Sequence, residues 1–214
     1  VPLEQSYEVW SLAVTNYSEK KRELTVTGYA EFTNNSNYEQ DQVNLQYSQY
    51  ITQTVFRGNR VRQMIHANLD RLEEGENIDN KNVFNRFFGL AGADVNSWCG
   101  DKESFLGRYH GYNNPEGVIT GKLSNKGNYN ENSCGALSTV LSLAPGETKE
   151  ITFLVGMKGD AEAGEIVEHY KNCQDVCKRE LEELIEYWHG QLSHFQIRPP
   201  SPEFNTMINT WNAY

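Results

Sequence analysis

No stretch of eighteen consecutive apolar residues occurs in the 214 residues of the chain, so the sequence predicts no membrane-spanning helix. The first ten residues, VPLEQSYEVW, have neither the basic segment nor the apolar segment of a secretory signal peptide. We therefore expect a cytoplasmic protein. The tripeptides that begin at Asn16 and Asn34 fit the glycosylation pattern, and without a signal sequence we expect both asparagines to be unmodified.

Positive charge is scarce as well. The chain has 19 Lys and Arg against 29 Asp and Glu, a formal net charge of −10. Nucleic acids and anionic membranes both attract clusters of basic residues, so we expect neither as a partner.

Cysteine is also rare, with four residues, far fewer than in a secreted domain stabilised by disulfides. Cys173 and Cys177 fall on a stripe of apolar residues that recurs every three or four positions between Ile166 and Phe195. This pattern favours small buried hydrophobic residues on an amphipathic helix, and a metal or redox site is the alternative. No set of His, Cys and Asp has the spacing of metal ligands, so we expect no metal site.

What the sequence does contain is a long region of β pattern. In residues 1–158, YEVWSLAVT and ELTVTGYAEF flank the polar residues 16–22, which predicts a β-hairpin. A second hairpin is predicted over residues 136–156, with its turn at Pro145 and Gly146. The predicted fold class is mainly β, with antiparallel strands.

The character of the chain changes after Gly159. Residues 161–195 predict one amphipathic helix, or two in series. Pro199 and Pro200 then require an extended link, and Ser201 is predicted to cap a further helix with Pro202 at its first position.

Residues 101–115, DKESFLGRYHGYNNP, concentrate charged and aromatic side chains. On a strand, Asp101 and Glu103 would point the same way, so one interpretation is a carboxylate pair of the glycosidase type. The alternative is that Asp101 caps a turn while Glu103 pairs with Lys102 or Arg108. The sequence leaves both open.

Aromatic residues in and near this stretch suit a sugar-binding face, because aromatic rings stack on the apolar faces of pyranoses. They are Trp98, Phe105, Tyr109 and Tyr112. The alternative is that they fill the end of a core. The sequence has no GxSxG, HExxH, P-loop or GxGxxG motif, so nothing in it forms an active site by itself.

Six stretches, in order along the chain, resemble one family: VPLEQSYEVWSLAVTN, ELTVTGYAEF, TVFRGNR, DKESFLGRYHGYNNPEGV, LAPGETKEITFLVG and FNTMINTWNAY. The chain is similar over essentially its whole length to the inverting glycoside phosphorylases of glycoside hydrolase family 94. These include cellobiose, cellodextrin and chitobiose phosphorylases.

The resemblance implies an architecture. Residues 1–158 would form an antiparallel, supersandwich-like β-sandwich whose N-terminal part is missing. Residues 159–200 would form amphipathic linker helices, and residues 201–214 would begin the first helix of an (α/α)6 barrel that lies outside this chain.

The resemblance also implies a reaction. Inorganic phosphate would cleave a β-glucosidic di- or oligosaccharide of the cellobiose or cellodextrin type, reversibly and with inversion, giving α-glucose 1-phosphate. The catalytic Asp would lie in the barrel, and no metal or organic cofactor is implied. The implied partners are a β-linked gluco-oligosaccharide, phosphate, the barrel domain of the same protein and a second subunit of a homodimer.

By the same resemblance, Arg57 in TVFRGNR would contact sugar in the acceptor subsite, with Arg60 as the second candidate. The alternative for both is a salt bridge between this loop and the barrel. Residues 61–85 depart from the family as an insertion.

The stretch 101–115 would build the end of the sandwich and its contact with the barrel or a second subunit. The interface candidates are Asp101, Glu103, Arg108 and Tyr109, and Lys102 stands where the family commonly has Arg. The hypothesis from a different functional class is a carbohydrate-binding β-sandwich module without catalysis.

Overall fold

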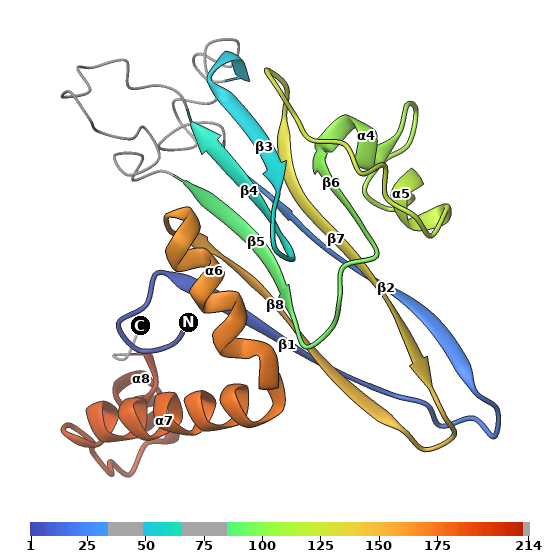
Figure 1. Cartoon of the computed structure of the whole chain (residues 1–214). Coiled ribbons are helices and arrows are strands. Elements are labelled where there is room, and N and C mark those ends of the chain that lie inside the picture. The colour runs from blue at the N-terminus through green and yellow to red at the C-terminus, as the bar shows by residue number, and fades with distance from the viewer. Residues whose placement is uncertain (34–48, 66–84, 212–214) are drawn as a thin grey trace.

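A computed structural model describes residues 1–33, 49–65 and 85–211 (Figure 1). The strands are β1 (Tyr7–Thr15), β2 (Arg22–Glu31), β3 (Thr52–Phe56), β4 (Arg60–Ile65), β5 (Arg86–Ala91), β6 (Ser97–Asp101), β7 (Ser133–Leu143) and β8 (Thr148–Met157). The helices are α4 (Lys102–Leu106), α5 (Glu116–Ile119), α6 (Asp160–His169), the 3-10 turn η1 (Tyr170–Asn172), α7 (Cys173–Ser193) and α8 (Pro202–Asn209). The chain is mainly β, as the sequence predicts.

The strands form two antiparallel sheets packed face to face. One sheet has five strands in the order β1-β8-β5-β4-β3, and the other has three in the order β2-β7-β6. Both predicted hairpins are therefore wrong, because β1 pairs with β8 and β2 pairs with β7. The connections at residues 16–21 and 144–147 each carry the chain from one sheet to the other (Figure 1).

Asn16 explains how these two sheet-to-sheet connections are held together. Its buried carboxamide nitrogen donates to the carbonyl oxygens of Lys20 at 2.8 Å, Leu143 at 3.0 Å and Ala144 at 3.1 Å. The turn predicted at Pro145 and Gly146 is confirmed: Gly146 has a φ of 75°, as position i+2 of a type II turn requires.

The core between the sheets is built by the alternation of side chains along each strand. In β5, Phe88 and Leu90 face the other sheet and are fully buried, while Phe87 and Ala91 face outward under α6 and η1. All six residues of β5 are buried because both faces of this strand are covered.

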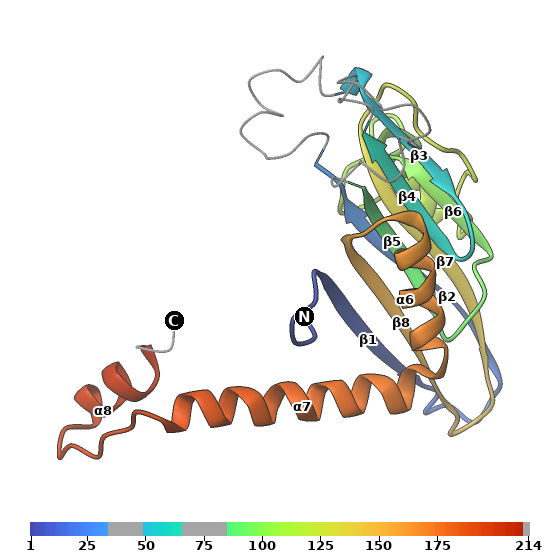
Figure 2. The ribbon, with the colours of Figure 1, turned by 60° about the vertical axis from the view of Figure 1, so that its left-hand side comes forward.

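Each sheet also has a covered outer face. Helix α6, η1 and the start of α7 pack on the five-stranded sheet, where Tyr170 is completely buried. Helix α4 packs on the three-stranded sheet through Phe105 and Leu106, against Cys99 and Cys134. Helices α6 and α7 thus lie on the side of the five-stranded sheet, and the short helices α4 and α5 lie at one end of the three-stranded sheet (Figure 1). Figure 2 shows α6 along the five-stranded sheet from another side.

The C-terminal helices form where the sequence predicts them, but less of their apolar stripe is buried than predicted. The predicted pair in series is present as α6 and α7, and Cys173 is buried as a small hydrophobic residue. The apolar stripe is covered only in its first half, since Trp188 is 51% exposed and Phe195 62% exposed. Helix α7 extends away from the sandwich before it reaches these positions (Figure 2).

The cap predicted for the last helix is confirmed, since the Ser201 hydroxyl accepts from the backbone N–H of Phe204 at 3.3 Å. The predicted insertion at 61–85 lies largely outside the described residues, as do the Asn34 tripeptide and the last three residues. Over the described ranges, no helix is both long and apolar enough to cross a bilayer.

Candidate functional site

The two arginine candidates lie on the tight hairpin that joins β3 to β4. Arg57 and Arg60 flank the two-residue loop of Gly58 and Asn59, and the backbone N–H of Arg57 donates to the Arg60 carbonyl at 2.9 Å. Both loop residues have positive φ, 53° and 58°, which makes this a type I′ turn. The turn places both arginine side chains near the start of α6.

Asp160, the first residue of α6, forms ion pairs with the arginines. Its carboxylate lies 2.5 Å from Nη2 of Arg60, 2.8 Å from Nη1 of Arg57 and 3.9 Å from Nη1 of Arg62. Arg60 also donates to the backbone carbonyl of Asp160 at 2.9 Å and to that of Gly58 at 3.2 Å. The hairpin is thereby fixed to α6, on the outer side of the five-stranded sheet.

The three arginines also determine the protonation state of the Asp160 carboxyl group. Burial by itself would raise the pKa of Asp160, but the hydrogen bond from Arg60 and the positive charges of Arg60, Arg62 and Arg57 outweigh it and lower the pKa. The carboxylate is therefore charged at neutral pH.

Arg57 and Arg60 differ in how much of the guanidinium is free to bind a ligand. The side chain of Arg60 is only 9% exposed and its guanidinium is occupied by Asp160 and Gly58. The side chain of Arg57 is 74% exposed and makes one contact with Asp160. The guanidinium of Arg57 is therefore oriented by Asp160 and accessible to a ligand. The guanidinium of Arg60 is buried and joins the hairpin to α6.

The second candidate region begins at Asp101, which caps α4. Its carboxylate accepts from the backbone N–H of Ser104 at 2.7 Å and from Nζ of Lys126 at 3.1 Å, and the residue is only 1% exposed. Glu103 is exposed and lies within α4. The strand geometry assumed for an Asp101–Glu103 pair is therefore wrong, and the capping alternative is confirmed for Asp101.

A different carboxylate pair is present at this end of the sheet. The side chain of Glu131, from the segment before β7, is the second carboxyl group near Asp101. Burial would raise the pKa of Asp101, but the hydrogen bond from Ser104, the neighbouring Glu131 and the contact with Lys126 lower it, and Asp101 in turn raises the pKa of Glu131. The sequence did not indicate this pair because thirty positions separate its members.

A polar cluster around Glu31 anchors the segment 101–115 through Lys102 and Tyr112. The carboxylate of Glu31 receives Nζ of Lys102 at 3.1 Å and the hydroxyl groups of Tyr29 and Tyr112. Nζ of Lys102 also lies 5.2 Å from the centre of the Tyr112 ring, within the range of a cation–π contact. Between these anchors, Arg108 and Tyr109 project into solvent, and Tyr109 is fully exposed.

The predicted sugar-binding aromatics are not brought together. Phe105 is buried and stacks on Tyr29 with ring centres 4.3 Å apart, and Trp98 stacks on Phe56 at 5.2 Å. These two therefore serve the core, which corrects that part of the sugar-face hypothesis. Tyr109 and Tyr112 remain on the surface.

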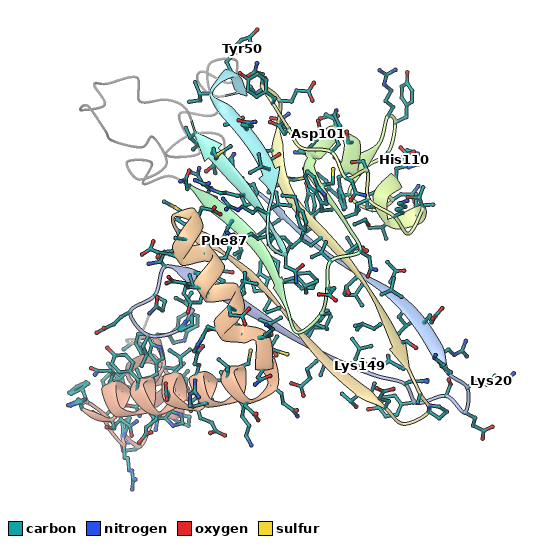
Figure 3. All side chains as sticks on the ribbon, in the orientation of Figure 1. Lys20, Tyr50, Phe87, Asp101, His110 and Lys149 are labelled. Carbon is teal, nitrogen blue, oxygen red and sulfur yellow. The ribbon has the colours of Figure 1, made fainter. Side chains whose placement is uncertain are left out.

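The two candidate regions lie on opposite outer faces of the sandwich. The arginine hairpin is next to α6, whereas Asp101 and His110 lie beside α4 and α5 (Figure 3). In the part of the chain that the structure describes, no group of three His, Cys, Asp or Glu residues is placed to hold a metal. Each region is a surface that presents a few side chains, and neither is an enclosed reaction site.

Comparison with known proteins gives these surfaces a context. The family model for the glycosyl hydrolase 94 supersandwich domain matches residues 1–173. An N,N'-diacetylchitobiose phosphorylase from Vibrio proteolyticus is 28% identical over 216 residues, and one from Vibrio furnissii is 28% identical over 215. Both alignments cover 100% of this chain and 25% of the relative.

A cyclic beta-(1,2)-glucan synthase from Rhizobium meliloti is 27% identical over 130 residues, which is 60% of this chain and 4% of that protein. The chain thus spans about a quarter of the length of the phosphorylases that it matches throughout.

Proposed function

Because the chain belongs to the glycosyl hydrolase 94 family through its supersandwich domain, we propose that it is part of an enzyme that cleaves a β-linked di- or oligosaccharide with inorganic phosphate. The observation that carries the proposal is the alignment of the entire chain with two phosphorylases. The described residues contain exposed contact groups without an enclosed catalytic set, which fits a supporting domain whose catalytic Asp lies elsewhere in the polypeptide.

In this proposal the reaction is a direct displacement with inversion. Phosphate supplies the nucleophile, so one protein carboxylic acid that protonates the departing oxygen is sufficient. The product is an α-sugar 1-phosphate and a shortened acceptor. The chemistry requires neither a metal nor an organic cofactor.

Arg57 is the residue of this chain that we propose to contact substrate, at the acceptor subsite. A guanidinium fork can donate two parallel hydrogen bonds to neighbouring sugar hydroxyl groups. The contact with Asp160 restricts the side chain while leaving 74% of its surface exposed, so less conformational entropy is lost on binding than for an unrestrained arginine.

The remaining exposed features suit contacts with other parts of the enzyme. We propose that Arg108 and Tyr109 meet the catalytic (α/α)6 domain or the second subunit of a homodimer. We propose also that residues 159–200 are the linker to that domain and residues 201–214 its first helix. The exposed apolar side chains of α7 and α8 support this assignment, because such surfaces mark contact sites. They are Leu181, Ile185, Trp188 and Leu192 in α7, and Phe204 and Met207 in α8, with Phe195 between the two helices.

For the substrate we propose a β-glucosidic sugar of the cellobiose or cellodextrin type, on the resemblance described above. N,N'-diacetylchitobiose is the second candidate, because that substrate appears in the names of the two relatives that cover the whole chain.

The test is phosphate-dependent release of a sugar 1-phosphate by the full-length protein. Cellobiose, cellotriose, laminaribiose and N,N'-diacetylchitobiose are supplied in parallel, with and without phosphate, and the 1–214 segment serves as the control. We expect release from one of these sugars by the full-length protein alone, unchanged by a metal chelator. Cleavage without phosphate would indicate a hydrolase instead. Sugar binding by the segment, with no cleavage by the full-length protein, would favour the carbohydrate-binding module.

A further inference from the structure

Two cysteines that the proposed reaction does not use lie beneath helix α4. Cys99 of β6 and Cys134 of β7 are both completely buried. They belong to one apolar cluster with Phe105 and Leu106 of α4. A pair of thiols in one cluster differs from a single buried cysteine, because two thiols can give up their hydrogens and form a covalent bond.

The strand register brings the two cysteines to the same face of the three-stranded sheet. Cys99 lies opposite Ala136, and Asp101 lies opposite Ser133. Two steps along β6 thus face three steps along β7, which is a β-bulge. Cys134 is the diagonal neighbour of Cys99 across these strands, and Sγ of Cys134 lies 3.7 Å from the Cys99 carbonyl oxygen. The two residues are therefore in contact.

The surroundings of Cys99 favour the reactive form of its thiol. The hydroxyl group of Ser124 donates to Sγ of Cys99 at 3.2 Å. The neighbouring Cys134 thiol lowers the pKa of Cys99 to about 7, with help from Ser124, although burial opposes this change. A substantial fraction of Cys99 is consequently thiolate at neutral pH, and the thiolate is the nucleophilic form of cysteine.

The pair also lies close to the surface of the domain. Ser124, whose hydroxyl group contacts Sγ of Cys99, is an exposed residue. The sulfur of Cys99 is therefore separated from solvent by a single side chain. A small oxidant needs only a local displacement of Ser124, or of the five-residue helix α4, to reach this sulfur.

The other two cysteines of the chain provide an internal comparison. Cys173 and Cys177 are four positions apart on helix α7. Cβ atoms at this spacing on a helix lie about 5–6 Å apart, whereas a disulfide requires about 3.5–4.5 Å. Sγ of Cys173 lies 3.3 Å from the carbonyl oxygen of Glu150, and Sγ of Cys177 lies 3.4 Å from the hydroxyl group of Thr152. These two thiols cannot form a disulfide while α7 is helical.

We propose that Cys99 and Cys134 are a dithiol pair that hydrogen peroxide oxidises to an intramolecular disulfide. The Cys99 thiolate attacks one peroxide oxygen and the O–O bond breaks, which gives a sulfenic acid and a hydroxide ion that takes a proton from solvent. The Cys134 thiol then attacks the Cys99 sulfur, and its proton leaves with the sulfenic hydroxyl group as water. In sum, two thiols lose two hydrogens and two electrons, and one peroxide becomes two waters.

The disulfide changes the support of helix α4. The Cys99 thiol donates to the Asp101 carbonyl oxygen at 3.1 Å, and the Cys134 thiol donates to the Cys99 carbonyl oxygen. Formation of the S–S bond removes both of these donors. Asp101 caps α4, and the apolar residues of α4 pack on the two sulfur-bearing side chains. Oxidation therefore loosens α4 at the start of the segment 101–115.

The test is treatment of the full-length protein with hydrogen peroxide, followed by peptide mass mapping without reduction. We expect one cross-linked peptide pair that contains Cys99 and Cys134, lighter by two hydrogens than its two components and separated again by dithiothreitol. Cys99 and Cys134 that stay reduced after the partly exposed Cys177 has been oxidised would overturn the proposal. Sulfinic acid at Cys99 without a cross-link would also overturn it.

Two variants and one exchange measurement complete the test. Cys134→Ala removes the second thiol, so we expect peroxide to leave Cys99 as sulfenic and sulfinic acid with no cross-link. Cys173→Ala is the matched control, and its cross-link between Cys99 and Cys134 should form as in the parent.

In the parent, the amides of α4 should exchange several-fold faster after oxidation and return to the initial rate with dithiothreitol. Equal exchange in the two redox states would refute the effect on α4. The mass of the cross-link is read without an activity assay, so this result does not depend on whether the protein is a phosphorylase.

Discussion

Replacing Asp160 by Asn tests the arrangement that supports the arginine hairpin. The change removes the charge that three guanidinium groups share and keeps the shape of the side chain. The side chains of Arg60 and Arg62 are 9% and 5% exposed, so water cannot replace the lost carboxylate for either of them.

The magnitude follows from the burial of these groups. Removing one partner of a buried ion pair costs about 3–5 kcal/mol, because the other charge stays buried and unpaired. Arg60 retains its bonds to two backbone carbonyl oxygens, and Arg57 is exposed and contributes little. We therefore expect a loss near the lower limit, about 3 kcal/mol.

Native-state hydrogen exchange of β4 and α6 in the full-length protein measures this local stability. A loss of about 3 kcal/mol corresponds to exchange on the order of 100-fold faster, since about 1.4 kcal/mol is a factor of ten. The matched control is Asp175→Asn, which removes an exposed carboxylate from the first turn of α7. We expect the control to stay within about threefold of the parent. The same small effect for Asp160→Asn would refute the reasoning.

Three further predictions follow from the other contacts. Arg57→Ala should raise the KM for the acceptor sugar in the synthetic direction by about tenfold, with kcat nearly unchanged. Arg57→Lys should restore part of the lost affinity. An unchanged KM would argue against a contact of Arg57 in the acceptor subsite. Asn16→Ala should destabilise the sandwich by about 2–3 kcal/mol in urea unfolding, because three carbonyl oxygens lose their donor, whereas exposed Asn113→Ala should cost under about 0.5 kcal/mol. The pKa values of Asp101 and Asp160 are lowered by folding, so their contribution is complete above the unfolded pKa of about 4 and is lost as the pH falls through the folded values. Exchange of α4 and α6 amides should therefore accelerate below that pH beyond the intrinsic pH effect, and Asp160→Asn should remove the α6 component.

Local pattern alone determined the kind of secondary structure along much of the described chain. The alternation in YEVWSLAVT and ELTVTGYAEF predicts strands because side chains of a strand point alternately to its two faces, and both segments form strands. The cap at Ser201, the turn at Gly146 and the helical stripe through Cys173 depend only on neighbours within a few positions. The family resemblance, carried by short ordered motifs, was equally readable from the sequence and agrees with the family model.

The tertiary structure alone decided which of these elements meet. Alternation predicts that Trp10 and Val26 point toward the core from their strands, but the same pattern fits a hairpin and two opposed sheets. The choice was made by contacts across the fold, such as the bond from Asn16 to Leu143, 127 positions away. Arg60 and Asp160 likewise meet across 100 positions, and no local pattern records that meeting. Exposure of Tyr109 and burial of Phe105, four positions apart, depend on a sheet that neither residue belongs to, so only the folded chain could separate the contact surface from the core.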